Sequence, residues 1–360
     1  MSADPIKLLK TKGFDKSRWM QLPRDVVIGH DVISQIPEVC ADLCLEDSAM
    51  VFFGGANTRE CAGDRVVSLL GETYSVSTFT VREMSMETIA EAEEAARGAG
   101  FLVGVGGGRV IDCAKIVSYN LDRPFLSVPT AASHDGIASA RASVPLVDGN
   151  ASLEAHPPMG IVADTAIIAA APHRLLAAGC ADVISNSTAV LDWELAHRLR
   201  HEVISEYAIA LSRMTAELLM KNARSIKPHS EESAWMVTKA LVSSGVAMSI
   251  AGSSRPASGG EHKFGHALER LAPGKVLHGE ACGIGTIMVM YLHGGDWRAI
   301  KAALRAIGAP TTPRDLGIDD ETAVEALLAA RTIRPERFTI LDTGLSRESA
   351  VRLVKMLYEE

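Results

Sequence analysis

Residues 101–144 read FLVGVGGGRVIDCAKIVSYNLDRPFLSVPTAASHDGIASARASV, and their pattern decides the fold. Phe101–Val105 is a short apolar run typical of a buried strand, Gly106–Gly108 follow it directly, and apolar residues then recur at helical spacing from Arg109. Glycines let backbone N–H groups approach an anion, and a helix N-terminus offers unpaired donors and a positive dipole end. The stretch therefore predicts a strand, a tight turn and a helix able to hold a nucleotide pyrophosphate.

The glycine spacing departs from the two common phosphate-binding motifs. Gly104, Gly106 and Arg109 break the G-x-G-x-x-G spacing, and no Lys-Ser/Thr pair follows as in a P-loop. Taken alone, the glycines are explained equally well by a structural turn between a strand and a helix. Support for nucleotide binding at this turn must therefore come from the rest of the sequence.

Strand-like and helix-like segments alternate around this turn. Such alternation predicts an α/β fold with a Rossmann-like parallel sheet, helices on both faces, and a ligand at the carboxyl ends of the strands. The expected strands are Ala49–Gly54, Tyr74–Val81, Phe101–Val105 and Phe125–Val128, and the expected helices are roughly Thr58–Leu70, Met86–Ala99 and Arg109–Tyr119.

From about Pro172 onward the pattern changes to long helical segments, such as Ala181–Arg200, Val203–Asn222 and Glu231–Ala251. The chain shows no internal repeat and no long Gly/Ser linker. We therefore expect a dinucleotide-binding α/β domain at 1–171 and an all-helical metal- and substrate-binding domain at 172–360. The two should pack directly, with the active site in the cleft between them.

Composition narrows the choice of partner and compartment. The 360 residues are 47% apolar and 22% charged, which is ordinary for a globular protein, and the net charge of −8 gives no attraction to nucleic acid. Six cysteines without a C-x-x-C pair indicate reduced thiols and a cytoplasmic protein. MSADPIKLLK at the start lacks a signal-peptide core, and the apolar region Gly160–Ala171 is too short to span a bilayer, so no integral membrane association is expected.

Three histidines cluster in EHKFGHALERLAPGKVLHGE, at His262, His266 and His278. A spacing of four residues puts the first two on one face of a helix, where they could bind a metal or serve two adjacent roles. The H-E-x-x-H pattern of zinc peptidases is absent, because Glu261 precedes the first histidine instead of following it. His197 and His201 have the same spacing, but Arg198 and Arg200 lie between them, so we interpret this pair as a solvated face.

The continuation of the glycine turn carries a family resemblance. GGGRVID followed by SVPTAASHDGIASARASV is similar to the glycerol-1-phosphate dehydrogenase family of archaeal type, as are MQLPRDVVIGHDVI and GSSRPASGGEHKFGHALE. That family lies within a wider group of iron- or zinc-dependent glycerol dehydrogenases, group III alcohol dehydrogenases and dehydroquinate synthases. The resemblance covers most of the chain and implies an enzyme.

The resemblance also assigns roles to particular residues. It implies a catalytic divalent ion, zinc by preference, held by Asp182, His262 and His278. The implied catalytic residues are these three and His266, and the implied substrate-binding residues are Asp135, Asp182 and His266. From the sequence alone, Asp182 is equally a helix-cap or salt-bridge residue, Cys180 is a conceivable thiolate ligand, and Asp135 is the start of an Asx turn. The implied cofactor-binding residues are Gly106, Gly107, Gly108, Arg109, Val110, Ile111, Asp112, Thr130, Ala131, Ala132, Ser133 and Ser139.

A phosphorylated substrate requires positive charge, and SHDGIASARAS resembles the phosphate-substrate branch of the group. Arg141, Arg255 and Lys263 could each supply that charge, Arg as a bidentate fork. Arg255 lies in GSSRP, a grouping suited to an oxyanion, yet it could equally belong to a surface loop. The sequence leaves the choice among the three open.

The expected activity is reversible, metal-assisted reduction of dihydroxyacetone phosphate by NAD(P)H to sn-glycerol 1-phosphate, the backbone of archaeal ether lipids. The alternatives are a glycerol or polyol dehydrogenase, a dehydroquinate-synthase-like lyase that recycles its NAD, and a nucleotide-binding regulatory protein without catalysis. No acid follows the first expected strand to hold an adenosine ribose, so NAD and NADP cannot be ranked. The resemblance further implies a homo-oligomer.

Overall fold

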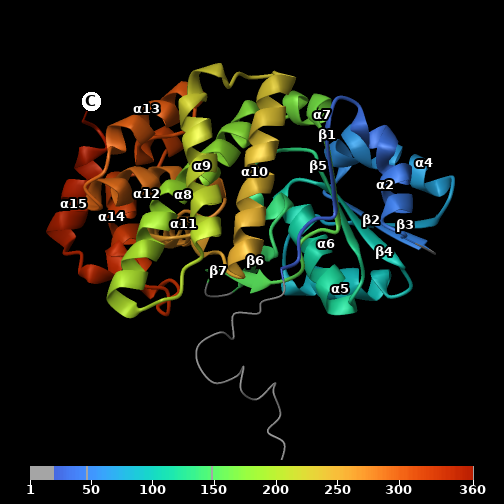
Figure 1. Ribbon diagram of the computed structural model, residues 1–360, viewed down its shortest axis with the longest axis horizontal. Helices are drawn as coiled ribbons and strands as arrows, with labels where there is room; N and C mark the ends of the chain where they lie inside the picture. Colours follow the sequence, from blue (N-terminus) through green and yellow to red (C-terminus); the bar gives the residue numbers. More distant parts are fainter. Residues whose placement is uncertain (1–19, 46–47, 147–148, 360) are drawn as a thin grey trace, which may run out of the picture.

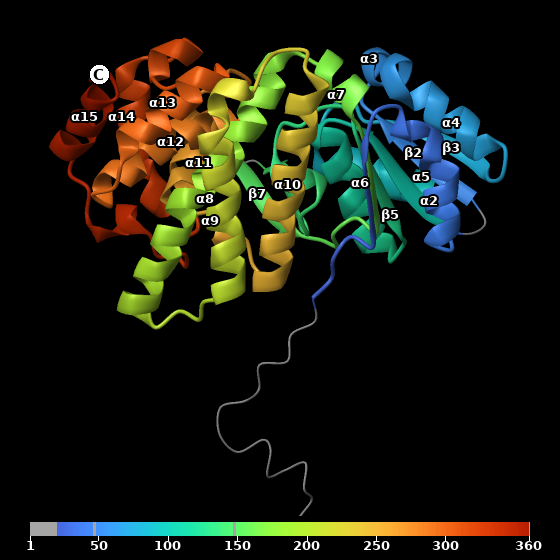
Figure 2. The ribbon, with the colours of Figure 1, turned by 45° about the horizontal axis from the view of Figure 1, so that its top comes forward.

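The computed structural model describes residues 20–45, 48–146 and 149–359, so the expectation for the first ten residues lies outside the described part. A half built on a parallel sheet lies beside a half built from helices, and the two pack against each other (Figures 1 and 2). The predicted fold class is thereby confirmed.

The sheet has six strands that are all parallel. After β2 the chain forms the edge strand β3 on one side of β2, and it then crosses over to form β4 on the other side of β2. The strand order therefore changes direction between β2 and β4. Ligands of open parallel sheets bind outside the carboxyl ends of the strands at such a point. In spatial order the strands are β1 (Asp25–Gly29), β8 (Gly160–Asp164), β5 (Phe125–Pro129), β4 (Phe101–Gly106), β2 (Ser48–Phe53) and β3 (Ser75–Thr80).

Side chains of the central strands alternate between two apolar cores, one on each face of the sheet. In β2, Met50 and Phe52 enter one core, whereas Val51 and Phe53 enter the other. This alternation follows from the two-residue period of a strand. The helices α5 (Met86–Ala96) and α6 (Gly108–Leu121) cover the first face, and α2 (Ile36–Asp42) and α4 (Asp64–Gly71) cover the second.

All four predicted strands are present within one or two residues, but the first predicted helix is interrupted. A short helix α3 (Ala56–Thr58) is followed by a π-helical turn at Arg59–Gly63 before α4 begins. The prediction missed β1, β8 and an antiparallel hairpin of β6 (Arg141–Leu146) and β7 (Gly149–Glu154). The first two are five-residue strands: β8 joins the sheet by pairing with β5, and β1 pairs with β8 at the edge of the sheet.

After β8 the short helix α7 (Thr165–Ala170) leads into the helical half, whose helices pack around α8, which is buried along most of its length. The predicted segment Glu231–Ala251 forms a helix with those bounds, and α8 begins eight residues earlier than predicted. The remaining helices are α8 (His173–Arg200), α9 (Glu206–Lys221), α10 (Glu231–Ala251), α11 (Gly260–Leu271), α12 (His278–Leu292), α13 (Trp297–Ile307), α14 (Asp320–Ala329) and α15 (Arg347–Met356).

The apolar residues 160–171 form β8 and α7, and a longer apolar helix is present at α10. By length and composition α10 is one helix that could cross a membrane, and 56% of its most apolar window is buried inside the protein. It packs against α9, α7 and α8, and core helices of this kind meet the same criterion.

A close backbone approach joins the two halves. A Cβ atom at Gly179 of α8 would lie 2.1 Å from the carbonyl oxygen of Ala132, which belongs to the loop after β5. Gly245 of α10 makes a second, less close approach to Ala138, with 2.8 Å between an added Cβ atom and the alanine methyl. Glycine at these positions lets two helices of the second half contact the loop that leaves the sheet.

Replacing Gly179 with Ala should therefore destabilise the protein by about 1–3 kcal/mol, because the methyl group would force α8 away from a backbone carbonyl. Urea unfolding followed by circular dichroism measures the change. Gly71→Ala is the matched control, since nothing lies within 4 Å of a Cβ atom there. A Gly179→Ala protein as stable as the control would contradict this account of the joint.

Candidate active site

A groove lies at the carboxyl ends of β2 and β4, where the strand order changes direction. It is lined by the turn at Gly54–Thr58 and by the turn at Gly107–Val110. A Cβ atom at Gly106 would lie 2.8 Å from Val110, and one at Gly108 would lie 1.7 Å from Nε2 of His134. The glycines therefore allow the close packing of this turn, and N–H groups at the start of α6 lie at the groove.

The structure places only some of the predicted cofactor residues at the groove, and Gly106 ends β4 directly before it. Thr130 donates its N–H to Gly106 and, like Ile111, is buried behind the groove. Ala132 lies against α8. Asp112 and Ser139 line a neighbouring cavity, where Asp112 accepts from the N–H of Ser143 at 3.0 Å. The groove itself is lined by Gly107, Gly108, Arg109, Val110, Ala131 and Ser133.

The neighbouring cavity has a volume of about 320 Å³ and lies between the sheet half and the helical half. His134, Gly108 and Arg109 line both the cavity and the groove, so the two spaces meet there. The predicted active-site cleft is thus present. Its other predicted lining residues are Asp135, Ser139, Arg141, His262, His266 and His278.

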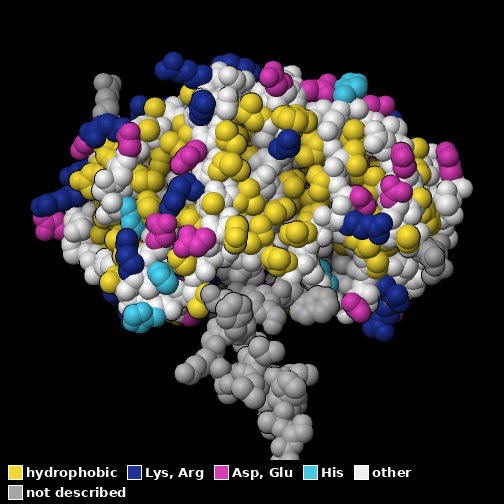
Figure 3. Space-filling view, in the orientation of Figure 1, with side chains coloured by type: hydrophobic (Ala, Val, Ile, Leu, Met, Phe, Trp, Pro, Cys, Tyr) yellow, Lys and Arg dark blue, Asp and Glu magenta, His cyan; other side chains and the backbone are white. Residues whose placement is uncertain are grey.

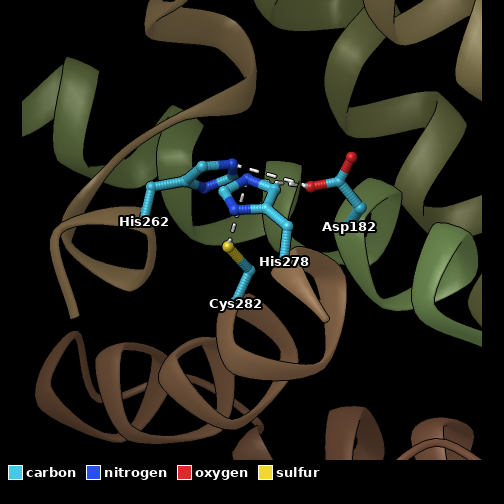
Figure 4. Close-up of side chains that lie close together, drawn as sticks. All are labelled: Asp182, His262, His278 and Cys282. Carbon is cyan, nitrogen blue, oxygen red and sulfur yellow. Dashed lines mark hydrogen bonds and ion pairs between the residues drawn. The ribbon is translucent and has the colours of Figure 1, made fainter. Parts of the chain in front are cut away.

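Four potential metal ligands meet beside the cavity (Figure 4). The Nε2 atoms of His262 and His278 lie 3.6 and 3.9 Å from Oδ1 of Asp182, and Cys282 Sγ lies 3.7 Å from Nε2 of His278. Ligand atoms around a tetrahedral zinc ion are about 3.4 Å apart. The donor set and its spacing therefore fit a divalent cation. The thiol in this group is that of Cys282, whereas Cys180 belongs to neither cluster of potential ligands among the described residues.

Two carboxylates orient the imidazoles, that of Glu261 fully buried and that of Glu269 partly buried. Glu261 accepts a hydrogen bond from Nδ1 of His262 at 3.0 Å, and Glu269 accepts one from Nδ1 of His278 at 2.7 Å. Both Nε2 atoms then face Asp182. A carboxylate behind a histidine ligand in this way fixes its tautomer and raises its basicity. The sequence analysis missed this role of both glutamates, although each lies within the histidine-rich stretch.

His266 is separate from the group around Asp182. Its Nδ1 lies 3.4 Å from Glu269, it lines the cavity, and burial lowers its pKa to about 4. His201, at the end of α8, is exposed, and His197 contacts only the carbonyl of Glu202 among the described residues, which agrees with the solvated face predicted for that pair. The two histidine pairs thus have the same spacing in the sequence, but one lies at the cavity and the other lies on the surface.

Asp135 contacts Asp182 directly and does not form the Asx turn considered from the sequence. Its N–H donates to Oδ2 of Asp182 at 3.0 Å, and its own carboxylate accepts from the hydroxyl of Ser244 at 2.8 Å. The turn is closed by His134, whose Nδ1 accepts from the N–H of Gly136. Burial and then the neighbouring Asp182 raise the pKa of Asp135 to about 7. Asp182 itself lies inside α8, so it is no helix cap.

Lys115 holds the loop that carries Asp135, and the sequence analysis missed it. Its fully buried Nζ donates to the carbonyl oxygens of Gly136 and Arg141 at 2.6 and 2.7 Å. Burial lowers its pKa, and Asp112 at 3.4 Å opposes that shift. The available signal was a lysine on the apolar face of an expected helix.

Two of the three basic residues considered for binding a substrate phosphate form ion pairs with carboxylates of the protein instead. Arg255 donates from Nε to Glu202 at 2.6 Å and also pairs with it through Nη2. Lys263 donates to both carboxylate oxygens of Asp342 at 2.8 and 2.9 Å. Arg141 lines the cavity, as does Arg334, which the sequence analysis did not consider.

Fold and site together define a dehydrogenase of the iron-containing alcohol dehydrogenase class, whose family model matches residues 27–172. A glycerol dehydrogenase from Schizosaccharomyces pombe has the same fold, with a TM-score of 0.80 at 20% identity over 95% of this chain and 90% of that chain. The full chain is 73% identical to a glycerol-1-phosphate dehydrogenase from Methanoculleus marisnigri and 71% identical to one from Methanosphaerula palustris, in both cases over 100% of each protein. The chain belongs to the glycerol-1-phosphate dehydrogenase family.

His262→Asn should abolish tight metal binding while NADH still binds, because the groove and the ligand cluster share no ligand residue other than His278. Metal content by mass spectrometry and NADH fluorescence titration measure the two effects. His201→Asn is the control: the residue is exposed, and asparagine tolerates its left-handed backbone at φ 56°. A fully metal-loaded His262→Asn protein would remove His262 from the ligand set.

Proposed function

We propose that this protein catalyses the reversible reduction of dihydroxyacetone phosphate to sn-glycerol 1-phosphate with NAD(P)H, and so supplies the glycerophosphate backbone of archaeal ether lipids. The observation that carries the proposal is the junction of a nucleotide groove with a cavity beside a carboxylate–imidazole cluster. Full-length relatives at 58–73% identity bear the name of this activity, with NAD(P)+ as the named coenzyme.

Asp182, His262 and His278 would hold the metal ion, for which we propose zinc. A divalent cation there supplies a Lewis acid that polarises the ketone of the substrate. Held by these three residues without Cys282, the ion would keep one coordination position for the substrate, which is the catalytic form of such sites. Glu261 and Glu269 keep the two imidazoles turned toward Asp182.

The remaining residues of the cavity position the substrate and the coenzyme. Asp135 and His266 both line the cavity and are our candidates for contacting the substrate hydroxyl and relaying the proton. His134 lies over Gly108 where the groove and the cavity meet, so it lies between the coenzyme and the substrate. Lys115 anchors the loop that presents Asp135.

We further propose that the division at 171/172 separates coenzyme binding from metal and substrate binding, and that the enzyme is cytoplasmic. All six cysteines are free. A homo-oligomer is supported by apolar side chains that are exposed over α9 and α10 (Figure 3). These include Tyr207, Met214, Leu218 and Trp235.

The decisive assay is NADH oxidation by the zinc-loaded enzyme with dihydroxyacetone phosphate, compared with unphosphorylated dihydroxyacetone. We expect turnover that requires the phosphate, stops on addition of a chelator and yields the sn-1 isomer by chiral analysis. His262→Asn serves as the inactive control. Preference for unphosphorylated dihydroxyacetone would make the protein a glycerol dehydrogenase instead. Phosphate release from a sugar-acid phosphate without net NADH change would make it a lyase.

A further inference from the structure

Four arginines lie close together beside one part of the cavity, and two of them, Arg141 and Arg334, line its wall. Arg141 comes from β6 and Arg255 from the turn at Arg255–Ala257, whereas Arg334 and Arg337 come from the segment between α14 and α15. Burial, followed by the charges of the other three, lowers the pKa of Arg337 to about 9. A partly buried cluster of like charges is costly unless an anion joins it. The cluster therefore indicates an anion site.

Contacts within the protein leave Arg334 as the arginine best able to serve the cavity. Arg255 is paired with Glu202, and Arg337 donates to Ser254 Oγ and to the carbonyl of Ser258, both at 2.9 Å. Arg334 forms no ion pair among the described residues, and its guanidinium approaches Ser254 Oγ at 3.4 Å. Arg141 lines the same cavity, 3.9 Å from the exposed carboxylate of Glu154.

Ser254 adds a donor between the arginines. Its hydroxyl oxygen accepts from Nη2 of Arg337 and from Nη1 of Arg334, and neither of these groups can accept a hydrogen bond in return. The hydroxyl hydrogen of Ser254 must therefore donate to another acceptor. Since Ser254 also lines the cavity, an anion there can provide that acceptor.

We propose that Arg334, together with Arg141 and Ser254, binds the phosphate group of the substrate. This inference rests on the proposed function, which requires a ketone phosphate. Guanidinium forks match phosphate oxygens bidentately. The cavity that contains Arg334 and Arg141 also contains His262 and His278. One small molecule can thus meet the histidines with its carbonyl and the arginines with its phosphate.

The coenzyme phosphates are a poorer match for these arginines. The groove that we assign to the nucleotide is lined by Arg109 and by the two turns after β2 and β4, and Arg141 and Arg334 line only the cavity. Loss of Arg334 should accordingly leave the affinity for NADH and the preference between NADH and NADPH unchanged.

Arg334→Asn is the sharpest variant. Arg334 has a left-handed backbone at φ 46°, which asparagine tolerates better than alanine, so charge is removed with little strain. Arg331→Asn is the matched control, because Arg331 is exposed, lies three residues earlier and does not line the cavity. We expect Arg334→Asn to raise KM for dihydroxyacetone phosphate about 10- to 100-fold, because charged hydrogen bonds to the phosphate are lost. Arg334→Lys should recover part of the loss.

A binding experiment separates this inference from the proposed function. Titration calorimetry of the metal- and NAD+-loaded enzyme with inorganic phosphate should show binding in the wild type and in Arg331→Asn, weakened at least 10-fold in Arg334→Asn. Wild-type turnover restricted to unphosphorylated dihydroxyacetone would reject the proposed function, while the titration would still decide the anion site. No phosphate binding in the wild type, or equal affinity in wild type and Arg334→Asn, would overturn the assignment of Arg334.

Discussion

The carboxylate of Asp182 is buried in an apolar helix, and its need for partners organises the site. One oxygen accepts the N–H of Asp135 from the loop after β5, and the other faces the Nε2 atoms of His262 and His278. A buried carboxylate is tolerated only with such partners. Asp182 thereby joins the sheet half to α11 and α12, and the residues of the cavity take their places around this contact.

Backbone packing makes that contact possible. α8 lies between the loop after β5 on one side and α12 on the other, and small residues allow both approaches. A Cβ atom at Gly279 would lie 1.9 Å from the carbonyl oxygen of Ala178, just as one at Gly179 would meet Ala132. Interiors packed at this density transmit small displacements. The distances among the potential ligands therefore depend on glycines that touch neither coenzyme nor substrate.

Two groups of charged side chains lie at different places around the cavity, and they match a substrate that has a ketone at one end and a phosphate at the other. Carboxylates and imidazoles gather around Asp182, whereas arginines gather around Ser254. In the first group, the negative charge of the carboxylates would be balanced by the imidazoles and by the proposed metal ion. The second group contains four arginines, whereas the structure pairs Glu202 with Arg255 and places the exposed carboxylate of Glu154 near Arg141, at 3.9 Å. An anionic ligand would complete it.

Local patterns in the sequence determined the parallel sheet, its glycine turn, the helical second half and the bounds of α10, because hydrophobic periodicity and turn residues act over a few neighbours. The ligand set around Asp182 came from family resemblance, since spacing alone left His262 and His266 as equal candidates. Only the tertiary structure paired β1 with β8, placed Glu261 and Glu269 behind the imidazoles, and engaged Arg255 and Lys263 while leaving Arg334 at the cavity. The pairing of β1 with β8 and the ion pairs of Arg255 and Lys263 join residues far apart in the chain, and the orientation of the imidazoles depends on where α8, α11 and α12 pack; the packing of whole elements sets such contacts, which no local pattern encodes.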